Sequence, residues 1–341
     1  MAQAKPLSLL VTGGAGYIGS HTATVLAGAG HRIVVLDSLI NGNSVAVSRA
    51  ARLSQHPIQF LKGDIRSESD LDRAWLEGPF DAVLHFAALK SVTESLEQPE
   101  LYREVNVSGT QMLCEAMTRH HCARLVFSSS AAVYGSGDGT PCGEDSELLP
   151  LNPYGASKAE AEQVVGAAAR EHGWRAISLR YFNPVGAHPS AEMGEDPKVR
   201  ANLAPVLLDV AIGATESMSV FGSDYPTRDG TCIRDYIHIM DLAEAHLCAL
   251  EHTGSGSAHR IFNVGTGHGS SVLEVLKIAR EVTAADIPAQ MVARRSGDCA
   301  ALVANVERVN QALGWCARFG LSEMLDSAWR WRCRNPVGYP G

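Results

Sequence analysis

The chain has 341 residues, 45% hydrophobic and 19% charged, a composition typical of a globular protein with one large or two modest domains. Its formal net charge of -8 argues against a nucleic-acid partner or an anionic membrane surface. The cysteines form no C-x-x-C pair, the histidines show no H-E-x-x-H spacing, and no apolar run reaches about 18 residues. We therefore expect a cytoplasmic protein with reduced thiols, no metal site and no membrane span.

The first elements predict a strand, a tight turn, a helix and a second strand. An apolar run at Leu7–Val11 indicates a buried strand, and Ser20–Ala29 has helical apolar spacing. A second apolar strand at Ile33–Leu36 ends in Asp37. Between the first strand and the helix lies a glycine turn, formed by Gly13, Gly16 and Gly19.

This arrangement predicts a dinucleotide site. Glycines let the backbone approach a pyrophosphate, whose charge is favoured at the helix N-terminus. Asp37 could accept both hydroxyls of the adenosine ribose, and its charge would repel a 2′-phosphate, which favours NAD over NADP. The alternative is an ordinary tight strand–helix turn, because the G-x-x-G-x-x-G spacing alone is weak.

Two further strands carry candidate cofactor contacts. Ile58–Leu61 ends near Asp64, which could bind an adenine amine or cap a helix. Asp81–Phe86 is followed by small residues, beginning with Ala87, that would let a ligand lie across the strand ends. Lys90 is then either a cofactor contact or a solvated loop lysine.

A long helix and a serine-rich turn follow. We expect one helix over Pro99–Met117, which contains Asn106, and then a strand over Leu125–Phe127. That strand leads into Ser128 and Ser130, at the end of the sheet where ligands bind in open parallel sheets. The Ser130 hydroxyl could bridge a catalytic tyrosine and a substrate oxygen, although serines after a strand are also common loop residues.

Tyr154 and Lys158 are the candidate acid–base pair. They lie four positions apart at the start of a helix predicted to run to about His172, so both side chains would share one face. A fixed ammonium stabilises a phenolate and lowers the pKa of the phenol, which lets the pair exchange a proton with a substrate hydroxyl. The spacing alone is weak, because it also arises by chance.

The alternation of strands and helices stops near Asn183, after a strand over Ala176–Arg180. We therefore predict an α/β fold with a Rossmann-type doubly wound parallel sheet and a smaller C-terminal α/β substrate domain. The predicted domains are residues 1–183, for the dinucleotide, and 184–341, with about 234–250 returning to the first domain.

Eight segments together are far more specific than the tyrosine–lysine pair. They are VTGGAGYIG (11–19), HFAALK (85–90), FSSSAAVYG (127–135), NPYGASK (152–158), RYFNPVGAHP (180–189), GEDP (194–197), FGSDYPTRDG (221–230) and RDYIHIMDL (234–242). Over almost its whole length the chain resembles the extended short-chain dehydrogenase/reductase superfamily and, within it, the UDP-glucose 4-epimerases. RYFNPVGAHP and RDYIH are similar to the epimerases rather than to the superfamily at large.

The resemblance implies both ligand sites. Its implied catalytic residues are Tyr154, Lys158 and Ser130. Its implied NAD contacts are Gly13, Gly16, Tyr17, Ile18, Gly19, Asp37, Asp64, Ile65, Phe86, Ala87, Lys90, Asn106, Ser128, Tyr154, Lys158, Tyr181 and Phe182. Its implied substrate contacts are Ser130, Tyr154, Asn183, Asn202, Leu203, Phe221, Arg234, Arg295, Asp298 and Leu302.

The implied reaction inverts C4 of a UDP-hexose, UDP-glucose or UDP-galactose, through a transient 4-keto sugar. Tyr154 would take the 4-hydroxyl proton while NAD accepts the hydride, and Ser130 would relay the proton. The arginines supply cationic forks for the pyrophosphate, Asp298 could accept ribose hydroxyls, and Phe221 matches the uracil-contact region. The resemblance also implies a homodimer formed through the helices near 99–117 and 154–172.

Three departures from the family pattern leave alternatives open. Ala132 stands where many such epimerases have Thr, Ala300–Ala301 replace a proline-containing loop, and Leu302 occupies the position that limits the sugar pocket. UDP-N-acetylglucosamine and UDP-glucuronate 4-epimerases remain alternatives, although no cation is assignable for a C6 carboxylate. A nucleotide-sugar 4,6-dehydratase would need an Asp/Glu pair where Ala131 and Ala132 stand. A non-catalytic NAD-binding regulator is the alternative from another class.

Overall fold

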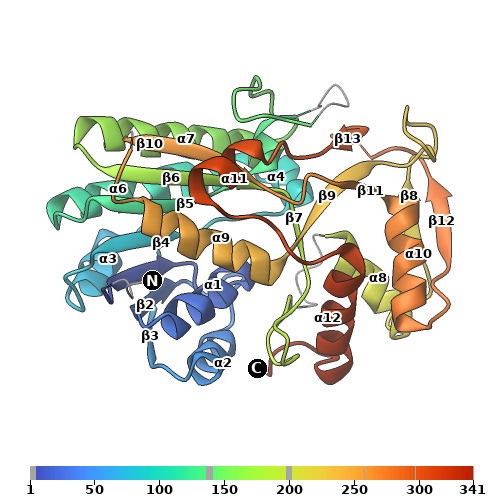
Figure 1. Cartoon of the computed structure of the whole chain (residues 1–341), viewed down its shortest axis with the longest axis horizontal. Coiled ribbons are helices and arrows are strands. Elements are labelled where there is room, and N and C mark those ends of the chain that lie inside the picture. The colour runs from blue at the N-terminus through green and yellow to red at the C-terminus, as the bar shows by residue number, and fades with distance from the viewer. Residues whose placement is uncertain (1–4, 136–140, 197–201, 257, 296, 341) are drawn as a thin grey trace. The chain divides into compact units, whose positions relative to one another are not determined.

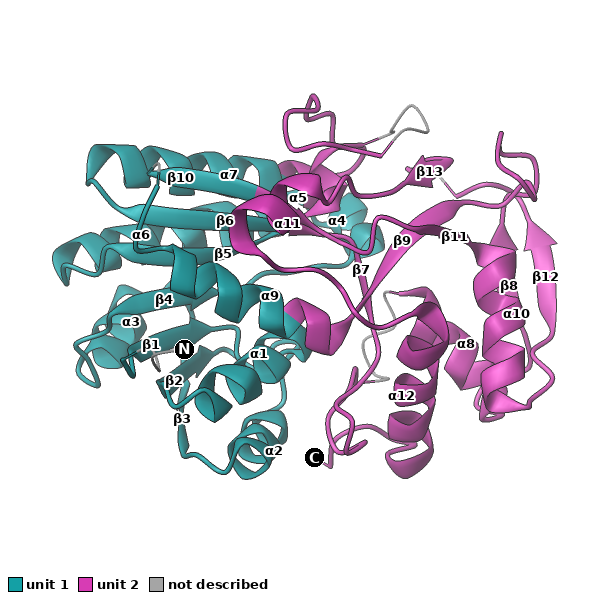
Figure 2. Ribbon diagram, in the orientation of Figure 1, with its two compact units in different colours: residues 1–129, 157–179, 243–261 teal, residues 130–156, 180–242, 262–341 magenta. Residues whose placement is uncertain are grey.

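The computed structural model describes residues 5–135, 141–196, 202–256, 258–295 and 297–340 (Figure 1). The chain folds into two compact units, coloured separately in Figure 2. Unit 1 comprises residues 1–129, 157–179 and 243–261, and unit 2 comprises residues 130–156, 180–242 and 262–341. Within the described ranges, no helix is long and apolar enough to cross a membrane.

A seven-stranded sheet forms the centre of unit 1, in the order β10-β6-β5-β4-β1-β2-β3. Its strands are β1 (Ser8–Thr12), β2 (Arg32–Asp37), β3 (Ile58–Lys62), β4 (Ala82–His85), β5 (Arg124–Ser130), β6 (Arg175–Tyr181) and β10 (His259–Val264). β1 pairs in parallel with both β2 and β4, so the polar residues after these strands emerge at one edge. The last residues of β5, β6 and β10 belong to unit 2.

Helices cover both faces of this sheet, which confirms the predicted doubly wound fold. The helical segments are α1 (Tyr17–Gly28), α2 (Ser44–Ser54), α3 (Glu68–Trp75), α4 (Val92–Glu97), α5 (Pro99–Arg103), the π-helical turn η1 (Glu104–Ser108), α6 (Gly109–Arg119), α7 (Pro153–Glu171) and α9 (Ile239–His252). On one face, α3, α6 and α7 bury Leu71, Leu113 and Val165 against Leu10 and Phe127 of the sheet. α1, α2 and α9 lie on the other face (Figure 2).

Two elements of unit 1 differ from the expectation. The predicted single helix over Pro99–Met117 is interrupted by the π-helical turn η1, which contains Asn106. Asn106 binds Leu89 and Ser157, and such contacts with distant segments leave no trace in local helical periodicity. β5 also continues to Ser130, because the three serines keep the extended backbone of the buried strand.

Unit 2 is smaller in its sheets and has its own core. β7 (Asn183–Val185), β9 (Ile233–His238), β11 (Gly269–Ser271) and β13 (Ala301–Leu302) form a four-stranded sheet, while β8 (Met218–Phe221) pairs in parallel with β12 (Ala289–Val292). The helical segments are η2 (Ala131–Val133), α8 (Leu203–Ala211), α10 (Val272–Thr283), α11 (Glu307–Leu313) and α12 (Leu321–Arg334). The helices α8, α10 and α12 lie together in unit 2 (Figure 1), and Leu207, Leu276, Met324 and Leu325 join them in one apolar cluster.

Candidate active site

The glycine turn after β1 brings backbone segments together too closely for side chains. Gly13 has φ +73°, and a Cβ on it would lie 2.4 Å from the backbone nitrogen of Ala87. A Cβ on Gly19 would lie 2.3 Å from the carbonyl oxygen of Gly13. Gly16 caps α1 without a side-chain hydrogen bond, and the first turn of α1 has no acidic residue. The first turn of α1 therefore presents backbone N–H groups and a positive helix end to an anion.

Asp37 is fixed beside this turn by two backbone donors. Its Oδ2 accepts a hydrogen bond from the Ala15 N–H at 2.9 Å and its Oδ1 accepts one from the Leu39 N–H at 2.8 Å. Burial raises the pKa of Asp37, and these two hydrogen bonds oppose that rise. Each carboxylate oxygen keeps a further lone pair, so the pair of oxygens fits a ribose diol. The glycine turn and Asp37 thus fit the adenosine diphosphate half of NAD.

The Asp64 carboxylate pairs with an arginine and does not cap a helix. Its carboxylate accepts hydrogen bonds from the Arg66 guanidinium at 2.7, 3.1 and 3.2 Å, which lowers the pKa of Asp64. The residue that caps α3 is Ser67, whose hydroxyl accepts a hydrogen bond from the Asp70 N–H. The alternative that Asp64 is the helix cap is therefore wrong. The neighbouring Ile65 is buried.

Asn106 fixes the segment that follows β4. Its Oδ1 accepts a hydrogen bond from the Leu89 N–H at 2.8 Å, and its Nδ2 donates to the Leu89 carbonyl at 3.0 Å and to the Ser157 hydroxyl at 2.9 Å. Both amide hydrogens are thus engaged by the protein. Asn106 therefore holds the segment that carries Phe86, Ala87 and Lys90, and its side chain has only a lone pair left for a ligand.

His85 is a buried neutral residue that the sequence did not single out. Its Nδ1 lies 2.7 Å from the Thr12 hydroxyl and its Nε2 lies 2.9 Å from the Thr110 hydroxyl. Thr110 donates to the Asn106 carbonyl, so the His85 Nε2–H donates to Thr110 and Nδ1 accepts from Thr12. Burial, aided by the charge of Lys158, lowers the pKa of His85 to about 3. The last residue of β4 is therefore a neutral imidazole, at the carboxyl end of that strand.

Lys158 is buried in unit 1. Its ammonium lies 4.9 Å from the centre of the Phe127 ring, a cation–π contact. Burial lowers its pKa to about 7, and the charge of Glu162 opposes that change. Lys158 therefore has a proton that can be lost near neutral pH, unlike a surface lysine.

Ser130 and Tyr154 are brought together in unit 2. Ser130 ends β5 and caps η2, because its hydroxyl accepts a hydrogen bond from the Ala132 N–H at 3.2 Å. Tyr154 lies in the first turn of α7, four residues before Lys158 on the same helix. Burial raises the pKa of the Tyr154 phenol, and a side-chain hydrogen bond with Ser130 opposes the rise. The chain therefore supplies a phenol in direct contact with a hydroxyl that can pass its proton on.

Four of the predicted substrate residues form one cluster in unit 2. Asp298 accepts hydrogen bonds from Arg295 at 3.0 and 3.2 Å and lies 3.8 Å from Arg234. Arg234 also donates to the Cys299 carbonyl at 2.9 Å. The Arg295 guanidinium lies 5.4 Å from the centre of the Phe221 ring, which is 41% exposed. Arg234, Arg295 and Asp298, here called the arginine cluster, thus offer two guanidiniums beside the exposed face of Phe221, as a pyrophosphate next to a base requires.

The remaining predicted residues lie on neighbouring elements. Leu302 is buried and pairs with Arg234 across β13 and β9. Asn183 donates to the Asp235 carbonyl at 3.0 Å, and Asn202, the cap of α8, donates to Glu195 at 3.0 Å. Leu203 begins α8, and Ser128 lies within β5. Tyr181 is buried as the last residue of β6, and Phe182 is buried directly after it. Tyr17 and Ile18 begin α1. Of the motif 194–197, Pro197 lies outside the described residues.

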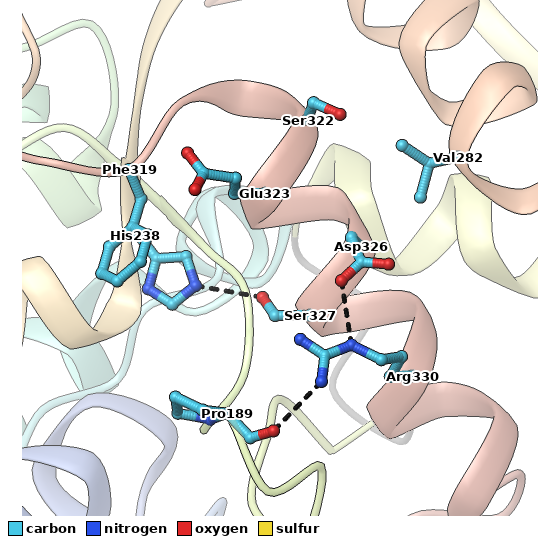
Figure 3. A pocket seen from close by; sticks show the side chains of 9 residues that line it. All are labelled: Pro189, His238, Val282, Phe319, Ser322, Glu323, Asp326, Ser327 and Arg330. Atoms are coloured by element: carbon cyan, nitrogen blue, oxygen red, sulfur yellow. Dashed lines mark hydrogen bonds and ion pairs between the residues drawn. The ribbon is translucent and has the colours of Figure 1, made fainter.

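A separate cavity of about 440 Å³ in unit 2 has a histidine and a serine in its wall (Figure 3). His238 Nδ1 accepts the Met240 N–H, and Ser327 donates to the Met324 carbonyl, so the His238 Nε2–H donates to Ser327 at 3.0 Å. Burial lowers the pKa of His238 to about 4. The imidazole faces the serine with a donor and cannot accept its proton. This pair is therefore not a nucleophile with its base.

Comparison with known proteins matches this arrangement to one family. The profile of the NAD dependent epimerase/dehydratase family matches residues 9–265. The chain is 46% identical to UDP-glucose 4-epimerase 3 of Oryza sativa over 97% of its length and 91% of the relative, and 44% identical to the UDP-glucose 4-epimerase of Bacillus subtilis over 98% and 99%.

Solved structures agree with the sequence comparison. The fold matches a Stenotrophomonas maltophila UDP-glucose-4-epimerase, solved with NAD and formylated UDP-arabinopyranose, with a TM-score of 0.94, 42% identity, and coverage of 97% and 99% of the two chains. It matches a Bifidobacterium longum UDP-glucose 4-epimerase, solved with NAD+ and UDP, with a TM-score of 0.93, 39% identity, and coverage of 97% and 100%. The chain therefore belongs to the NAD-dependent epimerase/dehydratase family.

Proposed function

We propose that this chain is an NAD-dependent isomerase that inverts C4 of a UDP-hexose, interconverting UDP-glucose and UDP-galactose. The observation that carries the proposal is the hydrogen bond between Ser130 and Tyr154 at the start of the helix that also bears Lys158. A phenol, a relaying hydroxyl and an ammonium are the groups that removal and return of a hydroxyl proton require. The relatives named above support the choice of a UDP-sugar as substrate.

NAD fits the residues of unit 1. The glycine turn and the first turn of α1 would hold the pyrophosphate, Asp37 would hold the adenosine ribose, and Lys158 would bind the nicotinamide ribose. When bound, NAD supplies a hydride acceptor at the reacting carbon and a positive charge that favours the phenolate. We further propose that Asp64 and Ile65 contact the adenine end of NAD, and that the residues after β4 contact its nicotinamide end.

The chain's own residues move the proton. Tyr154, as phenolate, takes the proton of the 4-hydroxyl, and Ser130 orients that hydroxyl and relays the proton. Because burial alone raises the pKa of Tyr154, the phenolate needs positive charge beside it, which is the part assigned to Lys158. Oxidation to the 4-ketone allows inversion without removing a proton from a carbon that is not acidic. The ketone turns over and is reduced on its other face.

Unit 2 supports the substrate part of the proposal. The arginine cluster of Arg234, Arg295 and Asp298 would anchor the UDP moiety, with Phe221 against the uracil. Asn183 and the N-terminus of α8, at Asn202 and Leu203, would contribute further phosphate contacts. Charged anchors confined to the UDP moiety leave the hexose free to rotate between the two half-reactions, as inversion requires. We therefore propose that the domain predicted over residues 1–183, with about 234–250, binds the dinucleotide, and that the domain predicted over residues 184–341 binds the nucleotide sugar.

The decisive assay is incubation of the purified protein with UDP-glucose or UDP-galactose and no added cofactor. The C4 epimer should form, because the dinucleotide stays bound and is regenerated. Tyr154→Phe should abolish most turnover and still retain NAD. A wild-type protein that forms no epimer from either sugar would contradict the proposal. The same assay with UDP-N-acetylglucosamine and UDP-glucuronate tests the pocket beside Leu302.

We also propose a cytoplasmic homodimer that associates through α5 to α6 and α7. None of the eight cysteines, all of which lie in the described ranges, forms a disulfide, which suits a cytoplasmic protein. Light scattering of the purified protein should give twice the mass of one chain. A monomer at micromolar concentration would exclude this assembly.

A further inference from the structure

Three buried polar side chains from separate segments of unit 2 meet in one hydrogen-bonded network. Tyr134, Arg180 and Asn263, here called the Tyr134 cluster, are 3%, 2% and 0% exposed. The Tyr134 hydroxyl donates to Asn263 Oδ1 at 2.6 Å and accepts from Arg180 Nη1 at 3.0 Å. The Arg180 guanidinium also lies 5.0 Å from the centre of the Tyr134 ring. A buried network of this kind is rigid, because each lost partner leaves a desolvated polar group.

The cluster is closed by the loop around Glu144. Arg180 donates to the Glu144 carbonyl at 3.0 Å, the Asn263 N–H donates to Glu144 Oε1 at 2.9 Å, and Asn263 Nδ2 donates to the Cys142 carbonyl at 2.7 Å. Burial raises the pKa of Tyr134 to about 12, so its hydroxyl keeps its proton and its direction of donation is fixed. The position of the Tyr134 hydroxyl is therefore fixed from both sides.

Tyr134 ends the short turn that starts at Ser130. The Tyr134 N–H donates to the Ala131 carbonyl at 3.1 Å, and the Ala132 N–H donates to the Ser130 hydroxyl. On its other side the turn touches the start of α7, since a Cβ on Gly155 would lie 2.4 Å from the Ala132 carbonyl oxygen. The turn is thus held between the Tyr134 cluster and the helical turn that carries Tyr154.

We propose that Tyr134 is a positioning residue, which through Asn263 and Arg180 holds the η2 turn so that the Ser130 hydroxyl meets the Tyr154 phenol, with Gly155 as the residue that permits this approach. The proposal rests on the proposed function, in which Ser130 relays the proton. Tyr134 is not assigned a contact with any reacting atom. Its hydroxyl acts through the position of Ser130, and displacements of about 1 Å in such groups cost roughly 100-fold in rate.

The test is a double-mutant cycle on the full chain. Tyr134→Phe should lower kcat by roughly 10- to 100-fold with little change in KM, since the UDP anchors are untouched. Ser130→Ala should lower kcat too, and adding Tyr134→Phe to it should cost nothing further. Tyr339→Phe is the matched control, because it removes another buried hydroxyl, bonded to Gly194, and should leave kcat unchanged. Independent losses that multiply in the double variant would overturn the proposal.

A second variant and a second measurement keep the test decisive. If Tyr134→Phe fails to fold, Gly155→Ala should give the same loss of kcat, with Gly28→Ala at the end of α1 as the control, because a Cβ there meets nothing within 4 Å. Ultraviolet titration of tyrosinate, with Tyr154→Phe to assign the signal, should give a higher Tyr154 pKa in Tyr134→Phe and Gly155→Ala than in wild type. An unchanged titration would refute the proposal even if the wild type formed no epimer, an outcome that would separately refute the proposed function.

Discussion

The side chain of Asn106 binds both backbone polar groups of Leu89: its Oδ1 accepts a hydrogen bond from the Leu89 N–H at 2.8 Å, and its Nδ2 donates one to the Leu89 carbonyl at 3.0 Å. The third hydrogen bond of the same amide goes to Ser157, the residue before Lys158. One side chain from a π-helical turn thus joins the segment after β4 to α7.

Replacing Asn106 by Ala should lower the free energy of unfolding by about 1–3 kcal/mol or more, because it leaves the polar groups of Leu89 buried without partners. Urea denaturation at neutral pH measures this. Asn310→Ala is the matched control, since Asn310 is exposed on α11 and its loss should change stability by about 0.5 kcal/mol or less. Equal midpoints for the two variants would contradict the role assigned to Asn106.

Gly13→Ala should destabilise the protein and release its NAD. At φ +73° an added Cβ is strained, and it would meet the Ala87 backbone at 2.4 Å. Gly28→Ala is the control, because Gly28 is helical and a Cβ there meets nothing within 4 Å, so stability should stay level or rise. The measurement is the NAD released on denaturing equal amounts of each purified protein. Full NAD content in Gly13→Ala would show that the glycine turn does not hold the dinucleotide.

Stability should fall as the pH drops from 6.5 towards 4. The folded protein holds the pKa of His85 near 3 and that of His238 near 4, while both would titrate near 6.5 when unfolded. Between the folded and unfolded pKa values the unfolded chain binds more protons than the folded chain. The free energy of unfolding therefore decreases as the pH is lowered, by up to about 1.4 kcal/mol per pH unit for each histidine. Urea titrations at several pH values should show this slope, and His238→Gln should reduce it. A flat profile over this range would be inconsistent with two neutral buried histidines.

Asp298→Asn should weaken UDP binding by roughly 10- to 100-fold, because hydrogen bonds to charged groups contribute about 1.5–3 kcal/mol each. The substitution removes the carboxylate that orders Arg234 and Arg295. Isothermal titration with UDP measures the change. Asp326→Asn, which removes a carboxylate paired with Arg330 elsewhere in unit 2, should leave the affinity unaltered. If both variants bind UDP like the wild type, the arginine cluster is not the UDP site.

The sequence predicted those parts of the fold that local patterns encode. Apolar runs at β1 to β6 and the glycine turn were visible, because a parallel sheet buries strands on both faces and needs its turn close to α1. The π-helical turn at Asn106 and the extension of β5 to Ser130 were not, because long-range hydrogen bonds and burial decide them. Likewise His85, Tyr134 and Asn263 gain their surroundings from segments far apart in the chain.

The sequence could predict the kind of chemistry at the site but not the contacts between its side chains. The order of Ser130, Tyr154 and Lys158 along the chain indicated acid–base chemistry, and the structure adds the hydrogen bond between the first two. That burial raises the pKa of Tyr154 and lowers that of Lys158 could not be read from the sequence, because desolvation depends on what packs around each group.

Because no side chain caps the first turn of α1, a small dianion could accept hydrogen bonds from the same N–H groups as the pyrophosphate. Phosphate or sulfate would then compete with the pyrophosphate of NAD during reconstitution of dinucleotide-free protein. Reloading of protein that has lost its dinucleotide would therefore need more NAD in phosphate or sulfate than in a zwitterionic buffer.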